Sequence, residues 1–323
     1  MKEVTTGMHG KAVFWLIATT AVWGLSFPMI KVLHLRHSGI DDTWLLTSWT
    51  LATRCLLTAL LLALMRPSAL RGITSHEWRQ SLGLVFFGGV GLMFQADGLA
   101  NTEASTSAFL TQFYCVLLPL WTCLRLRQWP ASKIAFCTLL VLIGMGILSK
   151  LTWSSMRLGP GEWKTIVAAT FFTGQILLLE QPKYADNRGI TITILCMAGT
   201  GIMAASCAVP YTHDWAGFFG RWMEVPDLVV LGVLTVGCTM FSYLMMNKWQ
   251  KFVKATEAGL IYCMEPVFTS LYVLFLPSIL GQWAGVRYEN EGITLSLIIG
   301  GGLVTLANLM LQLRPTAKPA SAN

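Results

Sequence analysis

Long apolar stretches recur along almost the whole chain, and they constrain its fold more than any other feature. A helix needs about 20 mostly apolar residues to cross the hydrocarbon core of a bilayer. We count ten such stretches in the 323 residues, and most of the connections between them are short. They cover approximately residues 12–33, 44–65, 81–100, 104–124, 134–151, 161–180, 190–210, 227–247, 255–276 and 292–313. The sequence therefore predicts an all-α integral membrane protein with ten transmembrane helices.

The composition agrees with a surface that faces lipid. Hydrophobic residues make up 54% of the chain and charged residues 12%, about half of the roughly 25% that is typical of soluble domains. The 8 cysteines all fall in apolar stretches, and none forms a Cys-x-x-Cys pair. We interpret them as small buried hydrophobic residues rather than as disulfides or metal ligands. We find no motif for nucleic acid, a metal or another cofactor, so the expected partners are the lipid bilayer and a small-molecule substrate.

Basic residues between the apolar stretches predict an orientation. If the N-terminus lies in the cytoplasm, most of the 23 lysines and arginines fall on the cytoplasmic side, as the positive-inside rule requires. Both termini are then cytoplasmic. The first apolar stretch continues to about Leu33 without a clean cleavage site, which favours a retained span over a signal peptide. The polar residues 314–323 are predicted to form a disordered cytoplasmic tail.

Two pairs of similar segments, each about 150 residues apart, indicate an internal repeat. A-V-W-G-L-S-F aligns with F-F-T-G-Q-I-L, which pairs Gly24 with Gly174. S-T-S-A-F-L-T-Q-F-Y-C aligns with T-E-A-G-L-I-Y-C-M-E-P, which pairs Tyr114 with Glu265. Five spans per half would invert the second half relative to the first, as in many secondary transporters. We predict one repeat over residues 1–151 and another over 152–313; chance similarity between apolar stretches is the alternative.

Four segments, in order along the chain, resemble the drug/metabolite transporter superfamily in its ten-helix EamA-type branch. They are W-G-L-S-F-P-M-I-K (Trp23–Lys31), R-C-L-L-T-A-L-L-L (Arg54–Leu62), Thr256–Leu271 and Gly292–Val304. Cys115 stands where the family usually has a proline in the fourth span. The resemblance implies a transporter rather than an enzyme. It also implies export of amino acids or related compounds across the inner (plasma) membrane of a bacterium.

Polar and aromatic side chains reach the middle of the predicted spans from several helices. At a rise of about 1.5 Å per residue, Arg54, Tyr114 and Glu265 lie about 15–16 Å from one end of their spans. Since the hydrocarbon core is about 30 Å thick, these residues are near the midplane, where alternating-access carriers bind their substrates. Helix packing is the alternative role for each candidate. The residues predicted to bind substrate or line a cavity are Trp23, Ser26, Phe27, Arg54, Gln95, Gln112, Tyr114, Gln175, Tyr243, Tyr262 and Glu265.

Arg54 and Glu265 are the two formal charges nearest the midplane. An unpaired charge at this depth costs roughly 2.5–3.5 kcal/mol on insertion scales, so each needs a partner or water. Arg54 can bind a substrate carboxylate, and Glu265 can bind an amine or carry a proton that couples transport. The structural alternatives are an ion pair between Arg54 and Glu265, a bond from Arg54 to a backbone carbonyl, and a protonated Glu265 that caps a carbonyl near Pro266.

These observations predict a secondary transporter of small polar or amphipathic metabolites, such as amino acids, that works as an exporter by alternating access. The regions around Gly24 and Pro28 and around Gly174 are predicted as flexible points. An intramembrane lipid-modifying enzyme is one alternative, but it would need a cluster of acids, histidines or cysteines at one interface. A non-transporting membrane sensor is another. Small-residue faces such as Gly300–Gly302 also leave a homo-oligomer open.

Overall fold

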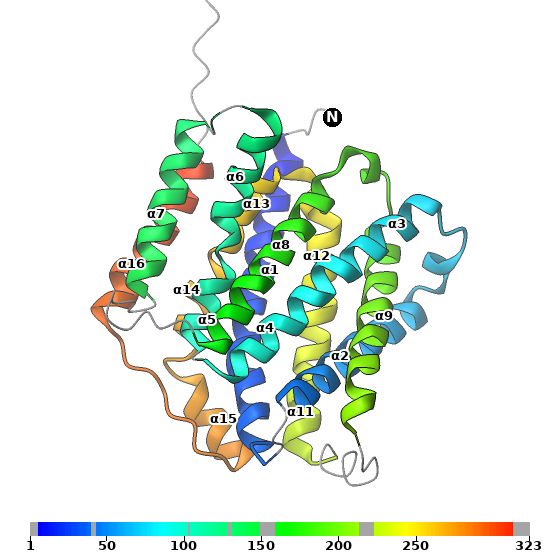
Figure 1. Cartoon of the computed structure of the whole chain (residues 1–323), viewed down its shortest axis with the longest axis vertical. Coiled ribbons are helices and arrows are strands. Elements are labelled where there is room, and N and C mark those ends of the chain that lie inside the picture. The colour runs from blue at the N-terminus through cyan, green and yellow to red at the C-terminus, as the bar shows by residue number, and fades with distance from the viewer. Residues whose placement is uncertain are drawn as a thin grey trace, which may run out of the picture.

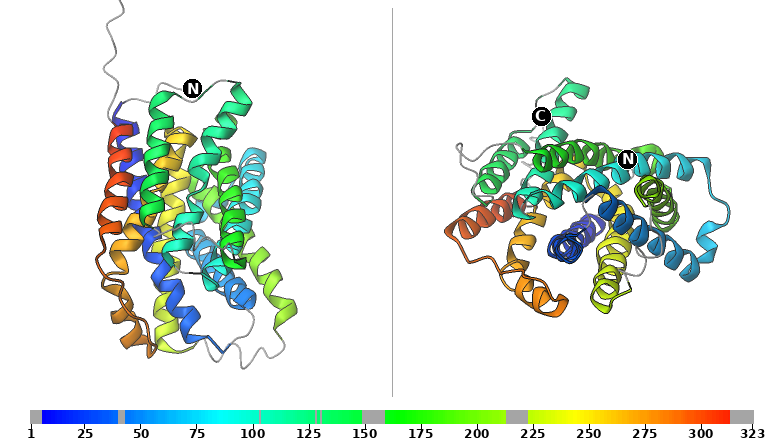
Figure 2. Two further views of the ribbon diagram at one scale, coloured as in Figure 1. Left: turned by 60° about the vertical axis from the view of Figure 1, so that its left-hand side comes forward. Right: turned by 60° about the horizontal axis from the view of Figure 1, so that its bottom comes forward.

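A computed structural model describes residues 6–39, 43–102, 104–127, 129, 131–148, 159–212 and 223–312. Within these ranges the chain forms helices joined by turns and short connections, and the helices lie side by side in one bundle (Figures 1 and 2). The first helix begins and the last helix ends at the same end of the bundle, which we call the N-terminal end (Figure 1). The predicted tail of residues 314–323 lies outside the described residues.

Helices cover every predicted span in the first half of the chain. They are α1 (Thr6–Arg36), α2 (Thr43–Met65), η1 (Pro67–Leu70), α3 (Ser75–Leu84), η2 (Val85–Gly89), α4 (Val90–Ala100), α5 (Ala104–Thr111), α6 (Tyr114–Leu126) and α7 (Ser132–Leu148). The segment η1 is a 3₁₀ helix, whereas η2 is a π-helical segment inside one long helix.

The second half is built in the same way. Its helices are α8 (Pro160–Glu180), η3 (Pro182–Tyr184), α9 (Gly189–Ala208), η4 (Val209–Tyr211), α11 (Val225–Val233), η5 (Leu234–Phe241), α12 (Ser242–Trp249), η6 (Gln250–Phe252), α13 (Ala255–Tyr262), α14 (Glu265–Tyr272), α15 (Leu276–Ala284) and α16 (Leu295–Gln312). Here η5 is the π-helical segment.

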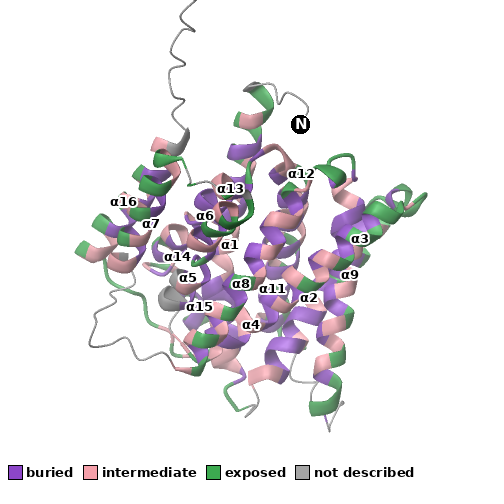
Figure 3. Ribbon diagram, turned by 45° about the horizontal axis from the view of Figure 1, so that its top comes forward, coloured by how far each residue is buried: buried purple, intermediate pink, exposed green. Residues whose placement is uncertain are grey.

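Several helical segments are long and apolar enough to cross a membrane in one piece. They are residues 7–36, 43–65, 75–100, 189–211 and 225–252. Helices also cover the other predicted spans, but without this combination of length and hydropathy in one piece. Buried residues lie on the faces that the helices turn toward one another (Figure 3), while large apolar side chains such as Leu64, Leu82 and Ile298 are exposed. The all-α class is therefore confirmed for the described residues, the apolar helices are consistent with a membrane protein, and the number of ten spans stays a prediction.

The fourth and ninth predicted spans are interrupted in the middle, which the apolar pattern did not predict. One break separates α5 from α6 at residues 112–113, and the other separates α13 from α14 at residues 263–264. Pro266 lies in the first turn of α14, where its missing N–H costs no helical hydrogen bond. The first break has no proline beside it, because Cys115 occupies the corresponding region.

The predicted end of the ninth span at Leu276 is wrong, because the chain continues there as another helix. After α14 ends at Tyr272, α15 begins at Leu276 and is bent by 62° from the preceding segment. Gly285 then has φ +69° and ends α15 in the left-handed conformation that glycine adopts easily. The short helix α15 lies at the end of the bundle opposite the N-terminal end (Figure 1).

Gly24 and Gly174 are positions of close helix packing in the structure. Both α1 and α8 continue through these residues without a break. A Cβ atom at Gly24 would lie 2.9 Å from the Cβ of Phe268 and 2.9 Å from the backbone N of Thr269. A Cβ atom at Gly174 would lie 2.3 Å from the ring of Phe87. Glycine thus allows α1 to approach α14, and α8 to approach η2, more closely than any other residue would.

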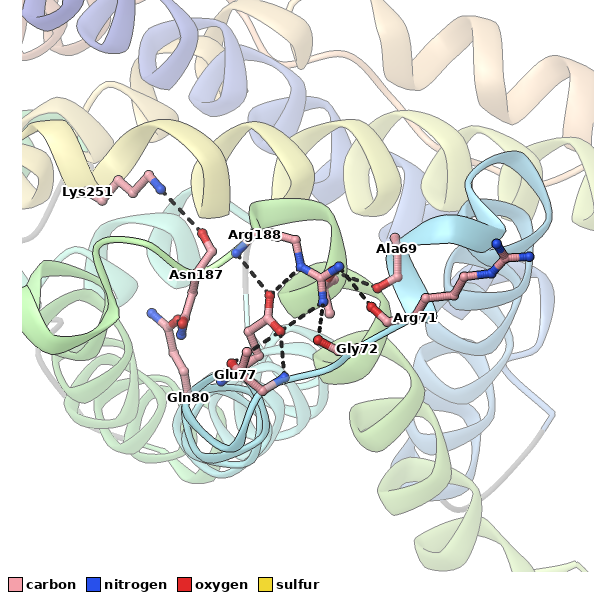
Figure 4. A network of polar contacts seen from close by, with 10 residues as sticks. Ala69, Arg71, Gly72, Glu77, Gln80, Asn187, Arg188 and Lys251 are labelled. Carbon is pink, nitrogen blue, oxygen red and sulfur yellow. Dashed lines mark hydrogen bonds and ion pairs between the residues drawn. The ribbon is translucent and has the colours of Figure 1, made fainter.

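A polar network at the N-terminal end joins α3 to the start of α9 (Figure 4). Thr74 and Glu77 form a capping box at the start of α3. The buried Glu77 carboxylate also accepts hydrogen bonds from Arg188, at 2.7 Å from Nε and 3.0 Å from Nη2. This contact holds the pKa of Arg188 above its usual value. Beside it, Asn187 donates a hydrogen bond of 2.7 Å to Gln80.

We expect Glu77→Gln to lower the unfolding temperature in detergent by roughly 2–4 °C, because the neutral amide cannot form the charged two-oxygen contact with Arg188. Thermal unfolding of the purified protein measures this effect. Arg79→Gln is the matched control, since Arg79 is exposed on the same helix. Equal shifts in the two variants would show that the contact does not stabilise the bundle.

Candidate functional site

A cavity of about 70 Å³ lies inside the bundle, next to both interrupted spans. It has room for several water molecules or for part of a small solute, since one water needs about 10–15 Å³ measured in this way. Its walls come from α1, α2, α4, α5 and α6 of the first half and from α8, η5, α12, α13 and α14 of the second. The cavity is thus assembled by helices that are distant in sequence.

All but one of the predicted site residues line this cavity. Those in the wall are Trp23, Ser26, Phe27, Arg54, Gln95, Tyr114, Gln175, Tyr243, Tyr262 and Glu265. Gln112 is the exception, because it is fully buried behind Tyr114 and Glu265. Sequence reasoning missed wall residues such as Thr111, Cys238 and Met246, whose small or apolar side chains are indistinguishable from ordinary core residues.

Glu265 is the first residue of α14, directly after the break that separates it from α13, and is only 7% exposed. Its Oε2 atom accepts a hydrogen bond of 2.8 Å from Nε2 of Gln112. The Tyr114 hydroxyl in turn donates to Oε1 of Gln112, which fixes the direction of the amide. Since Gln112 lies in the break between α5 and α6, this chain of hydrogen bonds connects the two interrupted spans.

Arg54 reaches the cavity from the middle of α2 and is 6% exposed. Its Nε atom is buried and has no hydrogen-bond partner. In the described part of the chain, no carboxylate oxygen lies within 4.0 Å of the Arg54 guanidinium, the distance that defines an ion pair. The neighbouring Cys55 thiol is the polar side chain in contact with the guanidinium. Neither an Arg54–Glu265 ion pair nor a bond from Arg54 to a carbonyl is present among the described residues.

An aromatic layer, formed by Trp23, Tyr243 and Tyr262, lies at one side of the cavity. The ring of Trp23 lies 5.7 Å from that of Tyr243 and 5.4 Å from that of Tyr262. The Tyr262 hydroxyl donates a hydrogen bond of 2.7 Å to Gln250, and Gln250 donates one of 2.9 Å to the carbonyl of Ile176. Because Gln250 begins η6, between α12 and α13, these contacts join this connecting segment to α8 and α13.

Two ion pairs join helices at the opposite end of the bundle. The fully buried Asp97 carboxylate of α4 accepts hydrogen bonds from Lys164 of α8 and, at 2.8 Å, from Thr43 of α2. The second pair joins α1 to α11, where Arg36 Nε donates to Asp227 at 2.8 Å. Sequence reasoning missed both pairs, because the partners are 67 and 191 residues apart.

His37 is part of the second ion-pair cluster. Its Nε2 atom lies 3.2 Å from Oδ1 of Asp227. Burial lowers the pKa of His37, although the Asp227 carboxylate acts in the opposite direction. The position of this histidine is therefore explained by a structural contact with Asp227 of α11.

Comparison with known proteins finds similarity to transporters. Residues 10–150 match the EamA-like transporter family. A protein of Archaeoglobus fulgidus described as an uncharacterized transporter is 23% identical over 301 residues, which cover 93% of this chain and 85% of that protein. A crystal structure with 17% identity matches with a TM-score of 0.64, over 94% of this chain and 97% of the other, and this likeness shows the fold alone. The match over residues 10–150 and the similarity along most of the chain to a protein described as a transporter support an EamA-type member of the drug/metabolite transporter superfamily.

Proposed function

We propose that this membrane transporter is a secondary carrier that exports small polar or amphipathic metabolites, such as amino acids. One observation carries the proposal: a central cavity, with walls from both halves of the chain, contains the buried side chains of Arg54 and Glu265. Charged groups at this depth are costly unless they serve a substrate or ion pathway. In carriers of this type the substrate site lies between the two halves, near the midplane.

Two inverted repeats, over residues 1–151 and 152–313, account for the recurrence of unusual backbone features. The helix breaks at residues 112–113 and 263–264 are about 150 residues apart, as are the π-helical segments η2 and η5. Gly24 and Gly174 are also positions of close packing in their respective halves. This recurrence supports a common origin of the two halves and argues against chance similarity between apolar stretches.

Alternating access is the mechanism that we propose, and contacts between helices on either side of the cavity are its candidate gates. The aromatic layer and the Glu77–Arg188 pair lie toward the N-terminal end, and the Asp97–Lys164 and Arg36–Asp227 pairs join helices at the other end. A substrate leaves when the contacts at one end separate while those at the other end hold. The positive-inside rule places the N-terminal end in the cytoplasm, and Glu265 is the candidate carrier of the coupling proton.

Flux measurements in liposomes test the proposal. The purified protein is reconstituted, and the exchange of a panel of radiolabelled amino acids and related metabolites is measured with and without a pH gradient. We expect saturable exchange of at least one compound that responds to the gradient. Flux no greater than that of protein-free liposomes across the whole panel would overturn the proposed function.

A further inference from the structure

Arg54 is a charge in the cavity wall that has no ion-pair partner among the described residues, and it indicates the class of solute that fits the site. We infer that the Arg54 guanidinium is the anchor for a substrate carboxylate, so that the carrier selects solutes with a carboxylate over their uncharged analogues. The inference rests on the proposed function and specifies the chemistry of the same site.

Burial makes the missing partner significant. Arg54 is 94% buried, since its exposed fraction is 6%, and its Nε atom lacks a hydrogen bond. Two other cationic side chains in the described part of the chain do have a carboxylate partner. Arg36 and Lys164 each contact a fully buried aspartate. A guanidinium that is withdrawn from water without a counter-ion destabilises the protein. A ligand anion removes this cost whenever the site is occupied.

The neighbouring carboxylate is held by another residue. Gln112 donates to Oε2 of Glu265, and the Tyr114 hydroxyl occupies the oxygen of the same amide. The amide therefore keeps its NH₂ group on Glu265. One oxygen of the Glu265 carboxylate is thus bound by Gln112, and no ion pair joins Glu265 to Arg54 among the described residues, so the guanidinium remains available to an external carboxylate.

The geometry of the guanidinium also favours an oxyanion such as a carboxylate over an uncharged ligand. A guanidinium donates two parallel hydrogen bonds to one carboxylate, which fixes both position and orientation. Trp23, Phe27 and Phe172 supply apolar surface in the same cavity, where the non-polar part of the solute packs. A solute with a carboxylate and an apolar group can thus bind the Arg54 guanidinium and pack against the apolar side chains of the same cavity.

Pairs of compounds that differ only in the carboxylate test the inference. The pairs are acetate and acetamide, L-alanine and L-alaninamide, and L-phenylalanine and L-phenylalaninamide. We expect at least one acid, and none of the amides, to raise the unfolding temperature of the purified protein. In Arg54→Gln the affinity for that acid falls by about tenfold or more. The exposed Arg79→Gln variant should behave as the wild type does.

A second measurement on the wild-type protein covers the case in which Arg54→Gln fails to fold. Phenylglyoxal modifies accessible guanidinium groups, and mass spectrometry of the peptide that contains Arg54 measures the extent. The acids should protect Arg54 at concentrations at which the amides do not. Equal effects of acid and amide, or no protection by any of the acids, would overturn the anchor. These outcomes concern only the role of Arg54. The proposed transport function would be overturned by a different result, the absence of flux of any compound in liposomes.

Discussion

Glu265→Gln should reduce transport by about tenfold or more, because a charged hydrogen-bonding group is lost, and should abolish its dependence on pH. A glutamine at this position cannot gain or release a proton. It has nearly the same volume, and its amide oxygen can still accept the hydrogen bond from Gln112 that Glu265 now accepts. The variant is therefore expected to stay folded in detergent. Flux from liposomes prepared at several internal pH values measures the effect.

Glu257→Gln provides the matched control for this experiment. Glu257 lies on α13, where it contacts His9 at 3.0 Å and where its side chain is 18% exposed. It does not line the central cavity. This variant should keep the flux and the pH profile of the wild type. If Glu265→Gln also retained both properties, Glu265 would play no part in coupling.

Gly24→Ala should lower the unfolding temperature and reduce transport, although alanine is the better helix former. The added Cβ would lie 2.9 Å from Phe268 Cβ and 2.9 Å from the backbone N of Thr269. Relief of this overlap requires α1 to move away from α14, and overpacking of this kind costs about 1–3 kcal/mol. Because α14 begins at Glu265, the same movement would displace the carboxylate in the cavity. Thermal unfolding and liposome flux measure the two consequences.

Gly302→Ala supplies the comparison for the packing argument. Gly302 is also inside a helix, and among the described residues no heavy atom beyond the nearby backbone of that helix lies within 4 Å of a Cβ placed there. The gain in helix propensity, up to about 1 kcal/mol, should then leave the stability unchanged or increase it. A similar response of Gly24 and Gly302 would mean that close contact between α1 and α14 does not explain the glycine at position 24.

The sequence determined the helical class and predicted the depth of the candidate residues in the membrane. Apolar stretches of about 20 residues leave a chain few alternatives to membrane helices, because lipid offers no hydrogen-bond partners to the backbone. Within such a helix the rise per residue is fixed at about 1.5 Å, so counting along the chain places Arg54, Tyr114 and Glu265 near the midplane. The predicted depth of these three residues therefore depends only on their positions along their own apolar stretches.

Only the tertiary structure decided which residues contact one another. The bend before α15, the role of Gln112 between Tyr114 and Glu265, and the absence of an Arg54–Glu265 ion pair among the described residues had no local signal. The Arg36–Asp227 pair joins residues that are 191 positions apart. Contacts of this kind depend on how the helices are rotated and packed against one another. Hydropathy along a single span contains no information about the rotation of its neighbours.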